Sequence, residues 1–401
     1  MTSIRSLYQK HVAQTSELSM MLEVDRAEGM YIYDISGKQY LDLNSGISVS
    51  SLGHRHPAVV SAVKDQVDKH MHTMVYGEHV HQPQVHFAQL LAQVLDNGLD
   101  SVYYLNGGTE AVEAAMKLAR KHTGRYEIVA CRNAYHGSTM GSESLRSDDD
   151  FTRAFLPGIP GVRHIDFNDV EQLEQISCRT ACVLLEPVQA ESGVNPPEEN
   201  YLQKVKARCQ EVGALMILDE IQTGFGRTGH LFAHQKYEVI PDIILIGKSM
   251  GGGMPISAFV ASKELMMSIA RKPMLGHITT FGGHPVCVAA AHASLQVLTS
   301  SDIVPEVLRK EQLIRQKLVH PIIKQVRSSG LMMAVELTKR KYLKHVVSHT
   351  IEQGALIDYF LFNSKSFRLA PPLIINDDQI AQGCDILLKA MDYAVAQYSR
   401  P

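Results

Sequence analysis

The stretch ALMILDEIQTGFGRTG, residues 214–229, decides the fold. A short apolar run, Leu215–Leu218, leads directly into an acidic residue, Asp219, and turn-forming glycines follow. Such a run predicts a fully buried strand of a parallel sheet. Asp219 would then emerge at the carboxyl end of this strand, which is the edge where open α/β sheets bind their ligands.

A second stretch is PDIILIGKSMGGGMP, residues 241–255. It has a basic residue after its apolar run, as the first stretch has an acidic residue after its own. Lys248 comes just after the apolar run Ile243–Ile246. A carboxylate and an amine are therefore expected at one edge of the sheet. Pyridoxal phosphate needs both, because a carboxylate keeps its ring nitrogen protonated and a lysine holds it covalently. Asp219 and Lys248 are the predicted catalytic residues, and pyridoxal 5'-phosphate is the predicted cofactor.

The middle of the chain, from about Asn44 to Thr299, alternates short apolar runs with helical stretches, which is typical of an α/β domain with a mostly parallel sheet. The expected strands are Val102–Leu105, Ile128–Cys131, Cys182–Leu185, Leu215–Leu218 and Ile243–Ile246.

The two ends of the chain read differently. Residues 23–43 predict a hairpin with its turn at Ser36-Gly37. Near the other end, PEVLRKEQLIRQKLVHPIIKQV (305–326) reads as helical and LMMAVEL (331–337) as a strand, and helix-rich sequence continues to Pro401.

Composition bounds the class of protein. The chain has 401 residues, 45% of them hydrophobic and 20% charged, with a formal net charge of −3. This length suits two domains, and the charge gives no basic field for nucleic acid. No membrane span or secretory signal is visible, so a cytoplasmic enzyme with small-molecule partners is expected. Six scattered cysteines lack disulfide or zinc spacing and read as small buried hydrophobes.

An anion cradle is predicted after the strand Val102–Leu105. Asn106 is followed by Gly107, Gly108 and Thr109, and then by a helix over Glu110–Lys121 that Gly124 stops. Glycine amides, a threonine hydroxyl and a helix amino end suit a phosphate. A plain strand-to-helix turn is the alternative.

Three further patterns are set aside. Residues 224–229 satisfy G-x-G-x-x-G, but Asp219–Thr223 intervene after the strand and no clean helix follows, which argues against a dinucleotide site. Gly247-Lys248-Ser249 resembles the end of a P-loop. However, Asp242 occupies the upstream position at which a P-loop requires glycine. Seven histidines fall between positions 54 and 86, yet without cysteines or a carboxylate set they favour surface or interface positions, and no metal is expected.

At this point the chain resembles the class III (ω-) aminotransferases, the group of acetylornithine, ornithine and 4-aminobutyrate aminotransferases. The resemblance covers about Leu41 to Pro372. Its motifs, in order, are LDLNSGISVSSLGHRHP (41–57), YYLNGGTEAVEAAMKLAR (103–120), AYHGSTMG (134–141), LLEPVQAESGV (184–194), LDEIQTGFGRTG (218–229), GKSMGGGMP (247–255), TTFGGHP (279–285) and RLAPPL (368–373). It implies the type I pyridoxal-phosphate transferase fold, with a large cofactor domain at 44–299 and a smaller discontinuous α+β domain made of 1–43 and 300–401.

The resemblance also assigns cofactor contacts. Gly107, Gly108 and Thr109 would bind the phosphate, although the family carries serine where this chain has Gly107. Thr280 would reach the phosphate of a neighbouring subunit, which implies a homodimer with shared active sites. Tyr135 would stack on the cofactor ring and Gln222 would donate to the ring hydroxyl. Core packing for Tyr135 and an ordinary loop amide for Gln222 are the alternatives.

For substrates, the resemblance implies that Arg368 grips the carboxylate of glutamate or 2-oxoglutarate and that Glu191 covers this arginine when an ω-amine is bound. An ordinary ion pair is the alternative, and Glu186 is a second carboxylate that could hold Arg368. Acetylornithine and ornithine enzymes usually carry an arginine at the position of Ser138, so the amine donor stays open.

The expected reaction moves a terminal amino group from an ω-amino acid or diamine to 2-oxoglutarate, giving glutamate and an aldehyde. An aminomutase of the glutamate-semialdehyde type is the first alternative, and the pair of Arg368 with Glu191 argues against it. A non-catalytic relative is the second, and the presence of Lys248 and Asp219 argues against that.

Overall fold

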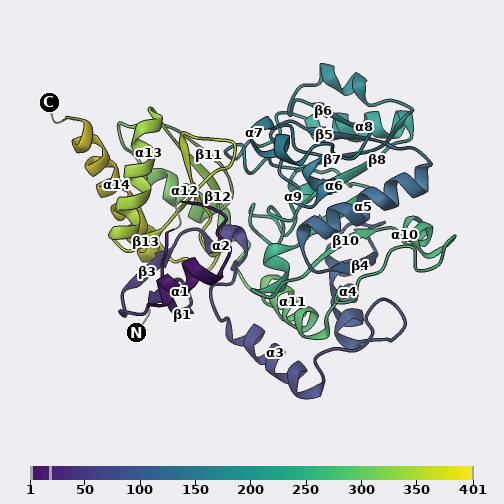
Figure 1. The fold of residues 1–401 in the computed structure, drawn as a ribbon, viewed down its shortest axis with the longest axis horizontal. Coiled ribbons are helices and arrows are strands. Elements are labelled where there is room, and N and C mark those ends of the chain that lie inside the picture. The colour runs from purple at the N-terminus through teal and green to yellow at the C-terminus, as the bar shows by residue number, and fades with distance from the viewer. Residues whose placement is uncertain (1–2, 18–19, 400–401) are drawn as a thin grey trace.

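A mostly parallel sheet organises the middle of the molecule. Within residues 3–17 and 20–399, which the computed structural model describes, this sheet has seven strands (Figure 1). In spatial order they are β4 (Ser101–Leu105), β10 (Ser257–Ala261), β9 (Ile243–Ile246), β8 (Leu215–Asp219), β7 (Thr180–Leu185), β5 (Glu127–Cys131) and β6 (Val162–Ile165). Strand β10 runs antiparallel to β4 and β9, and the neighbours from β9 to β6 are parallel.

The five strands expected from apolar runs are confirmed. Their side chains alternate between two apolar clusters, as a pleated strand requires. On β7, Cys182 and Leu184 pack in one cluster, and Val183 and Leu185 in the other. Helix α5 (Gly108–Thr123) covers the first face and α8 (Tyr201–Val212) the second, so the sheet is buried on both sides.

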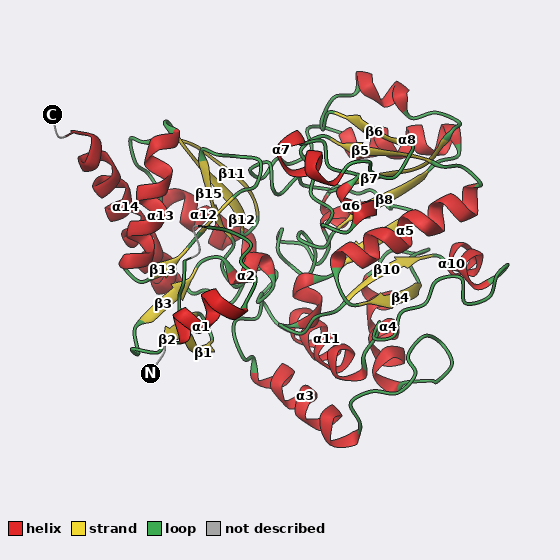
Figure 2. Ribbon diagram, in the orientation of Figure 1, coloured by secondary structure: helices red, strands yellow, loops and turns green. Residues whose placement is uncertain are grey.

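Two smaller sheets lie beside the central one (Figures 1 and 2). The first combines β1 (Val24–Glu28), β2 (Tyr31–Asp34), β3 (Gln39–Asp42) and β13 (Ala355–Leu356). The second combines β11 (Ile323–Ser329), β12 (Met332–Leu337), β15 (Ser366–Leu369) and β14 (Asp358–Tyr359). Strands β2 and β3 form the predicted hairpin, with Gly37 at a φ of 84°. Because β13 pairs with β3, the two ends of the chain share a sheet, which supports the discontinuous domain that we propose for 1–43 and 300–401.

The prediction of a helix over residues 305–326 is correct for the first half of this range and wrong for the second half. Helix α12 covers Val307–Lys317, and strand β11 starts at Ile323. Pro321 lies between them, and proline cannot supply the amide that a continuing helix needs. The segment from Ile323 therefore pairs with β12, where LMMAVEL forms the predicted strand.

The remaining elements connect these sheets (Figure 2). They are α1 (Ile4–His11), α2 (Ser45–Ser48), α3 (Pro57–Lys69), α4 (Gln82–Val94), α6 (Met140–Glu143), α7 (Asp149–Thr152), η1 (Arg153–Phe155), η2 (Glu171–Gln175), α9 (Ala233–Lys236), η3 (Lys248–Gly251), α10 (Lys263–Ala270), α11 (Pro285–Thr299), α13 (Arg340–Glu352) and α14 (Asp377–Ser399). In the described parts of the chain, no helix combines the length and apolar character that crossing a bilayer requires.

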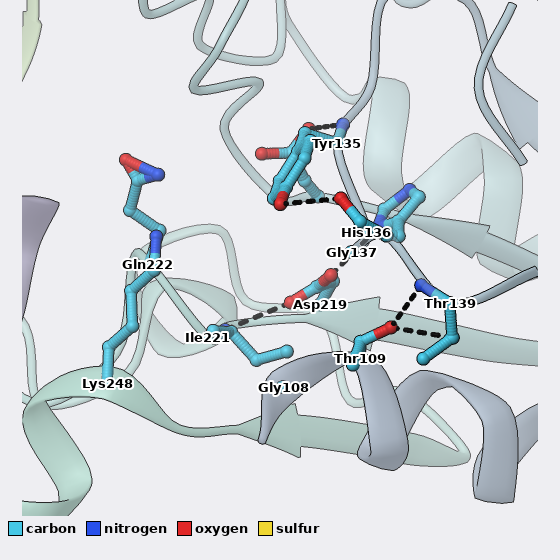
Figure 3. Close-up of a pocket in the computed structure, with 12 residues that line it drawn as sticks. Gly108, Thr109, Tyr135, His136, Gly137, Thr139, Asp219, Ile221, Gln222 and Lys248 are labelled. Carbon is cyan, nitrogen blue, oxygen red and sulfur yellow. Dashed lines mark hydrogen bonds and ion pairs between the residues drawn. The ribbon is translucent and has the colours of Figure 1, made fainter. Parts of the chain in front are cut away.

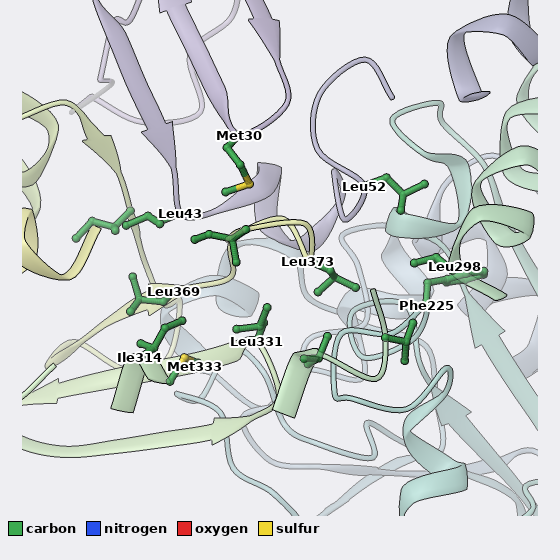
Figure 4. Packing of buried hydrophobic residues seen from close by; sticks show 14 of the residues in the cluster. Met30, Leu43, Leu52, Phe225, Leu298, Ile314, Leu331, Met333, Leu369 and Leu373 are labelled. Atoms are coloured by element: carbon green, nitrogen blue, oxygen red, sulfur yellow. The ribbon is translucent and has the colours of Figure 1, made fainter. Parts of the chain in front are cut away.

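One apolar core runs through both parts of the molecule. Figure 4 shows Met30, from the turn between β1 and β2, and Leu43, just after β3, on the same side as Leu369 and Leu373, with Phe225 near Leu298. This core continues to residues of β9 and β10 in the central sheet. The edge where Asp219 and Lys248 emerge is therefore held between packed elements from three regions of the chain.

Candidate active site

Asp219 and Lys248 line one cavity of about 450 Å³ (Figure 3). Asp219 is the last residue of β8, and Lys248 follows β9 after a single glycine. Since β8 and β9 are parallel neighbours, both residues leave the sheet at its carboxyl edge, as expected. The volume falls in the range of ordinary small-molecule pockets.

Two donors hold the Asp219 carboxylate, which is 5% exposed. Nδ1 of the buried His136 lies 2.7 Å from Oδ2, and the Ile221 amide donates to Oδ1 over 3.1 Å. An ionised carboxylate accepts hydrogen bonds and does not donate, so Nδ1 of His136 is the donor. His136 is a residue of the candidate site that sequence reasoning missed, although it directly follows Tyr135 in AYHGSTMG.

Lys248 opens η3 at a φ of 47°, in the left-handed region that non-glycine residues rarely adopt. Its side chain keeps some accessible surface because it lines the cavity, but it lies deep in the protein. Burial lowers the pKa of Lys248 to about 8, against the opposing pull of nearby carboxylates, Glu191 first among them. A larger share of this amine is therefore neutral near physiological pH than for a solvated lysine.

The predicted cradle lies at the amino end of α5, where Gly107 is the N-cap and Gly108 and Thr109 line the cavity. The Thr109 hydroxyl is already engaged by Thr139, at 2.7 Å, and by Ser142, at 2.5 Å. The same oxygen accepts the Thr139 amide at 3.2 Å, so the hydroxyl is tied to neighbouring groups of the protein. The amides of the first helical turn are further donors that an anion could meet.

A close approach of two segments shapes this corner of the cavity. Gly137 adopts a φ of 122°, and a Cβ there would lie 2.4 Å from Oγ1 of Thr109. Only glycine fits such a position. The AYHGSTMG segment can therefore lie directly against the start of α5.

Tyr135 and Gln222 also line the cavity. The Tyr135 hydroxyl is 3.3 Å from the hydroxyl of Ser138, which is exposed. The Gln222 amide nitrogen is 3.5 Å from Oε1 of Glu191. The structure thus brings the predicted ring contacts to the same cavity as Asp219 and Lys248.

Glu186 is buried in the cavity wall. Its carboxylate accepts hydrogen bonds from the amides of Ala190, at 3.1 Å, and Tyr135, at 3.4 Å. Burial raises the pKa of Glu186 to about 7, and the neighbouring charges of Asp219 and Glu191 act in the same direction. The guanidinium of Arg368 is bonded to Glu191 and not to Glu186.

Arg368 and Glu191 form a buried ion pair. Nη2 of Arg368 donates to Oε2 of Glu191 over 2.7 Å, and the two side chains are 2% and 6% exposed. The same oxygen accepts the Leu361 amide at 3.2 Å, while Nη2 also reaches the Tyr359 carbonyl at 3.2 Å. The guanidinium lies 4.7 Å from the centre of the Phe360 ring, and its Nε and Nη1 have no acceptor.

Thr280 does not line this cavity within its own chain. It is exposed, and its carbonyl accepts a hydrogen bond from Nε2 of His72 over 2.9 Å.

The G-x-G-x-x-G match at 224–229 folds as consecutive turns, followed by the short helix α9. Arg227 within it is fully buried and binds the Leu331 carbonyl at 2.9 Å and the Ser51 hydroxyl at 3.1 Å. This segment therefore ties the central part of the chain to the smaller sheets. The free cysteines at positions 131, 182, 209, 287 and 384 are buried, as expected, but Cys178 is exposed, so the expectation is wrong for that residue.

Comparison with known proteins assigns the chain to a family. The profile of Aminotransferase class-III matches residues 12–391. Acetylornithine aminotransferase of Bacillus cereus is 37% identical over 380 residues, covering 92% of this chain and 95% of the relative. Ornithine aminotransferase 1 of Staphylococcus aureus is 37% identical over 378 residues, covering 90% and 93%.

Solved structures agree. The ornithine aminotransferase of Toxoplasma gondii, crystallised with partial occupancy of pyridoxal phosphate at its active site, superposes with a TM-score of 0.91 at 31% identity, covering 98% of this chain and 95% of that one. N-acetylornithine aminotransferase from Stenotrophomonas maltophilia gives a TM-score of 0.82 at 31% identity, covering 98% and 99%. With this fold, this profile match and a lysine and an aspartate in one cavity, the chain belongs to the class III aminotransferases, pyridoxal-phosphate-dependent enzymes of fold type I.

Proposed function

We propose that this aminotransferase moves the terminal amino group of an ω-amino acid or diamine to 2-oxoglutarate, giving glutamate and an aldehyde. The observation that carries the proposal is the buried pair of Arg368 and Glu191. An arginine that can be covered or uncovered by a glutamate lets one pocket accept a carboxylate in one half-reaction and an uncharged end in the other. The named relatives act as acetylornithine and ornithine aminotransferases, so the comparisons do not favour the aminomutase alternative.

The cavity fits the cofactor chemically. Asp219 offers a buried carboxylate for a ring nitrogen, Lys248 offers an amine with a lowered pKa, and the amino end of α5 offers unpaired amides for a phosphate. Tyr135 would lie against the ring face, and Gln222 would donate to the ring hydroxyl. When bound, pyridoxal phosphate supplies an electron sink for the substrate carbanion.

The chain's own residues would carry the proton chemistry. Nζ of Lys248 would hold the cofactor and, with the amine substrate bound, would move a proton at the substrate carbon as base and acid. His136 orients Asp219 so that its charge stays directed at the ring nitrogen. Arg368 holds the carboxylate of the 2-oxo acid, and Glu191 covers Arg368 when the amine donor is bound.

We further propose a homodimer in which Thr280 completes the neighbouring phosphate site. The support is a region of exposed apolar side chains on two adjacent segments, which His72 links through its bond to Thr280. These side chains are Met71, Met74, Val80, Val85, Met274, Leu275, Ile278 and Phe281. Exposed apolar side chains gathered on neighbouring segments are typical of protein interfaces. A cytoplasmic location is also part of the proposal, supported by the six free cysteines, which a reducing compartment preserves.

Purified enzyme with pyridoxal phosphate and 2-oxoglutarate tests the function directly. The amine panel contains acetylornithine, ornithine, lysine, 4-aminobutyrate and putrescine, and glutamate formation is the readout. Glutamate should form with at least one of these amines and not in the Lys248→Ala variant. If no amine gives glutamate while glutamate 1-semialdehyde is isomerised without any 2-oxo acid, the aminomutase reading replaces this proposal.

A further inference from the structure

A second buried arginine, Arg146, lies beside the active-site cavity. It follows α6, and its Nη1 lies 3.0 Å from each carboxylate oxygen of Glu143. The two side chains are 5% and 9% exposed. Nε and Nη2 of Arg146 are buried without an acceptor. Unpaired buried donors are costly, and in native proteins they usually mark a missing water, ion or ligand.

Three aromatic rings surround this guanidinium. Its Cζ lies 5.5 Å from the ring centre of Tyr135, 4.6 Å from that of Phe151 and 5.3 Å from that of Phe362. Tyr135 is itself a wall of the cavity, and its hydroxyl contacts Ser138. Arg146 is therefore in contact with a residue of the cavity wall, although it does not itself line the cavity.

The guanidinium groups of Arg146 and Arg368 have similar contacts. Each pairs with one glutamate, each lies over a ring from residues 360–362, and each keeps two nitrogen atoms without an acceptor. Arg368 is the arginine that we propose for the α-carboxylate of 2-oxoglutarate. Arg146 has similar surroundings and packs against Tyr135 of the same cavity, so it is suited to a second carboxylate.

The geometry points to Arg146 as the residue that binds the distal carboxylate of 2-oxoglutarate, so that the enzyme selects a dicarboxylic 2-oxo acid. This inference rests on the function proposed above. Ser138 cannot supply the positive charge at this end of the cavity, and Arg146 can. A carboxylate would also give Nε and Nη2 the acceptors that they lack.

The contacts of Glu191 extend to the segment that packs against Arg146. The Leu361 amide is bonded to the Glu191 carboxylate, and the Phe362 amide donates to the Glu191 carbonyl over 3.1 Å. When a substrate carboxylate displaces Glu191 from Arg368, the Leu361 bond is lost as well. The Phe362 main chain stays bonded to the Glu191 carbonyl, so a carboxylate that reaches Arg146 requires movement of the Phe362 side chain, whose ring packs over the guanidinium.

The test compares two acceptors in the holoenzyme. The amino form of the enzyme, prepared with its best amine, reacts in single turnovers with 2-oxoglutarate or with pyruvate, which lacks a distal carboxylate. In Arg146→Met, kcat/KM for 2-oxoglutarate should fall roughly 10- to 100-fold relative to that for pyruvate, as expected for lost hydrogen bonds to a charged group. Arg146→Lys, which keeps the charge, should recover part of the preference.

Control variants separate binding from folding. Arg132→Met removes an exposed arginine of the same region, which pairs with Asp166 at 3.4 Å, and should leave the preference unchanged. The double variant Glu143→Gln with Arg146→Met avoids a buried unpaired carboxylate and should still lose the preference. Equal losses for both acceptors, or an unchanged ratio, would overturn the inference. Wild-type enzyme that transfers an amino group to neither acceptor would instead contradict the proposed function.

Discussion

Nδ1 of His136 donates a 2.7 Å hydrogen bond to the carboxylate of Asp219 across 83 positions of sequence. Both side chains are buried, and Nε2 of His136 has no partner. The pair fixes the orientation of the carboxylate that we propose for the cofactor's ring nitrogen. His136 is thus a positioning residue, which acts through Asp219.

Asp219→Asn should keep the shape of the site and remove its charge. We expect cofactor binding to persist and turnover to fall on the order of 10³-fold, because a neutral side chain cannot keep the ring nitrogen protonated. His136→Phe should cost roughly 10- to 100-fold, the usual effect of a hydrogen bond to a charged group. His136→Gln retains a donor and should lose less. Steady-state rates with the preferred amine measure all three, and an Asp219→Asn variant of wild-type activity would refute the assignment.

The lowered pKa of Lys248 predicts how fast the cofactor attaches. The amine is protonated below its pKa of about 8 and cannot attack an aldehyde, so covalent attachment to cofactor-free enzyme should speed up as pH rises and level off above about 8. Stopped-flow absorbance between pH 6 and 10, a range chosen around that value, follows the attachment. Lys248→Ala should show no attachment and no turnover. A rate that still climbs near the ordinary lysine pKa of about 10.4 would show that burial does not lower this pKa.

Glu186 should change charge near neutrality. Because burial raises its pKa to about 7, the carboxyl group is neutral at pH 5 and ionised at pH 9. Infrared difference spectra of the cofactor-free protein should therefore lose the band of a protonated carboxyl group as pH rises through this range. The same band should be missing from Glu186→Gln at every pH. Identical wild-type and variant spectra at pH 5 would contradict the prediction.

The serine at position 138 lets us predict which amine donor the enzyme prefers. It is exposed and uncharged where acetylornithine and ornithine enzymes usually present an arginine, so a donor carboxylate that reaches it gains no ion pair. We expect acetylornithine to rank behind a smaller or differently charged amine in kcat/KM. Ser138→Arg should narrow this difference. Acetylornithine as the clearly preferred wild-type donor would show that another cation serves it.

Local patterns in the sequence explain why some strands, and the site residues at their ends, can be predicted. Apolar runs such as Leu215–Leu218 and Ile243–Ile246 identify strands that are buried on both faces, and so locate Asp219 and Lys248 at one edge. Strand β6, with Arg163 and His164 in its middle, has no such run and escapes detection.

Other features depend on contacts between distant segments, which no local pattern contains. Helical periodicity before Pro321 hides the strand β11, whose partner β12 is what stabilises it. The importance of His136 comes from a carboxylate on the distant strand β8, and that of Arg146 from Phe362, more than half the chain away. The resemblance of the motifs identifies Arg368 and Glu191 as a candidate pair. The distance between them and their burial are seen only in the structure.

The pair of Arg368 and Glu191 tests the account most directly, because it is expected to let one pocket hold two substrates of opposite polarity. Stopped-flow absorbance of the bound cofactor measures the amine and 2-oxoglutarate half-reactions separately. Arg368→Ala should weaken the 2-oxoglutarate half-reaction by about 2–5 kcal/mol, the usual cost of losing one partner of a buried charge pair, and should affect the amine half-reaction less. Glu191→Ala should do the reverse, because an uncovered arginine penalises the uncharged end of the donor. Arg309→Ala, which breaks an exposed pair with Asp377, is the control and should change neither. Equal losses in both half-reactions for both variants would reduce the pair to a structural ion pair and contradict the account.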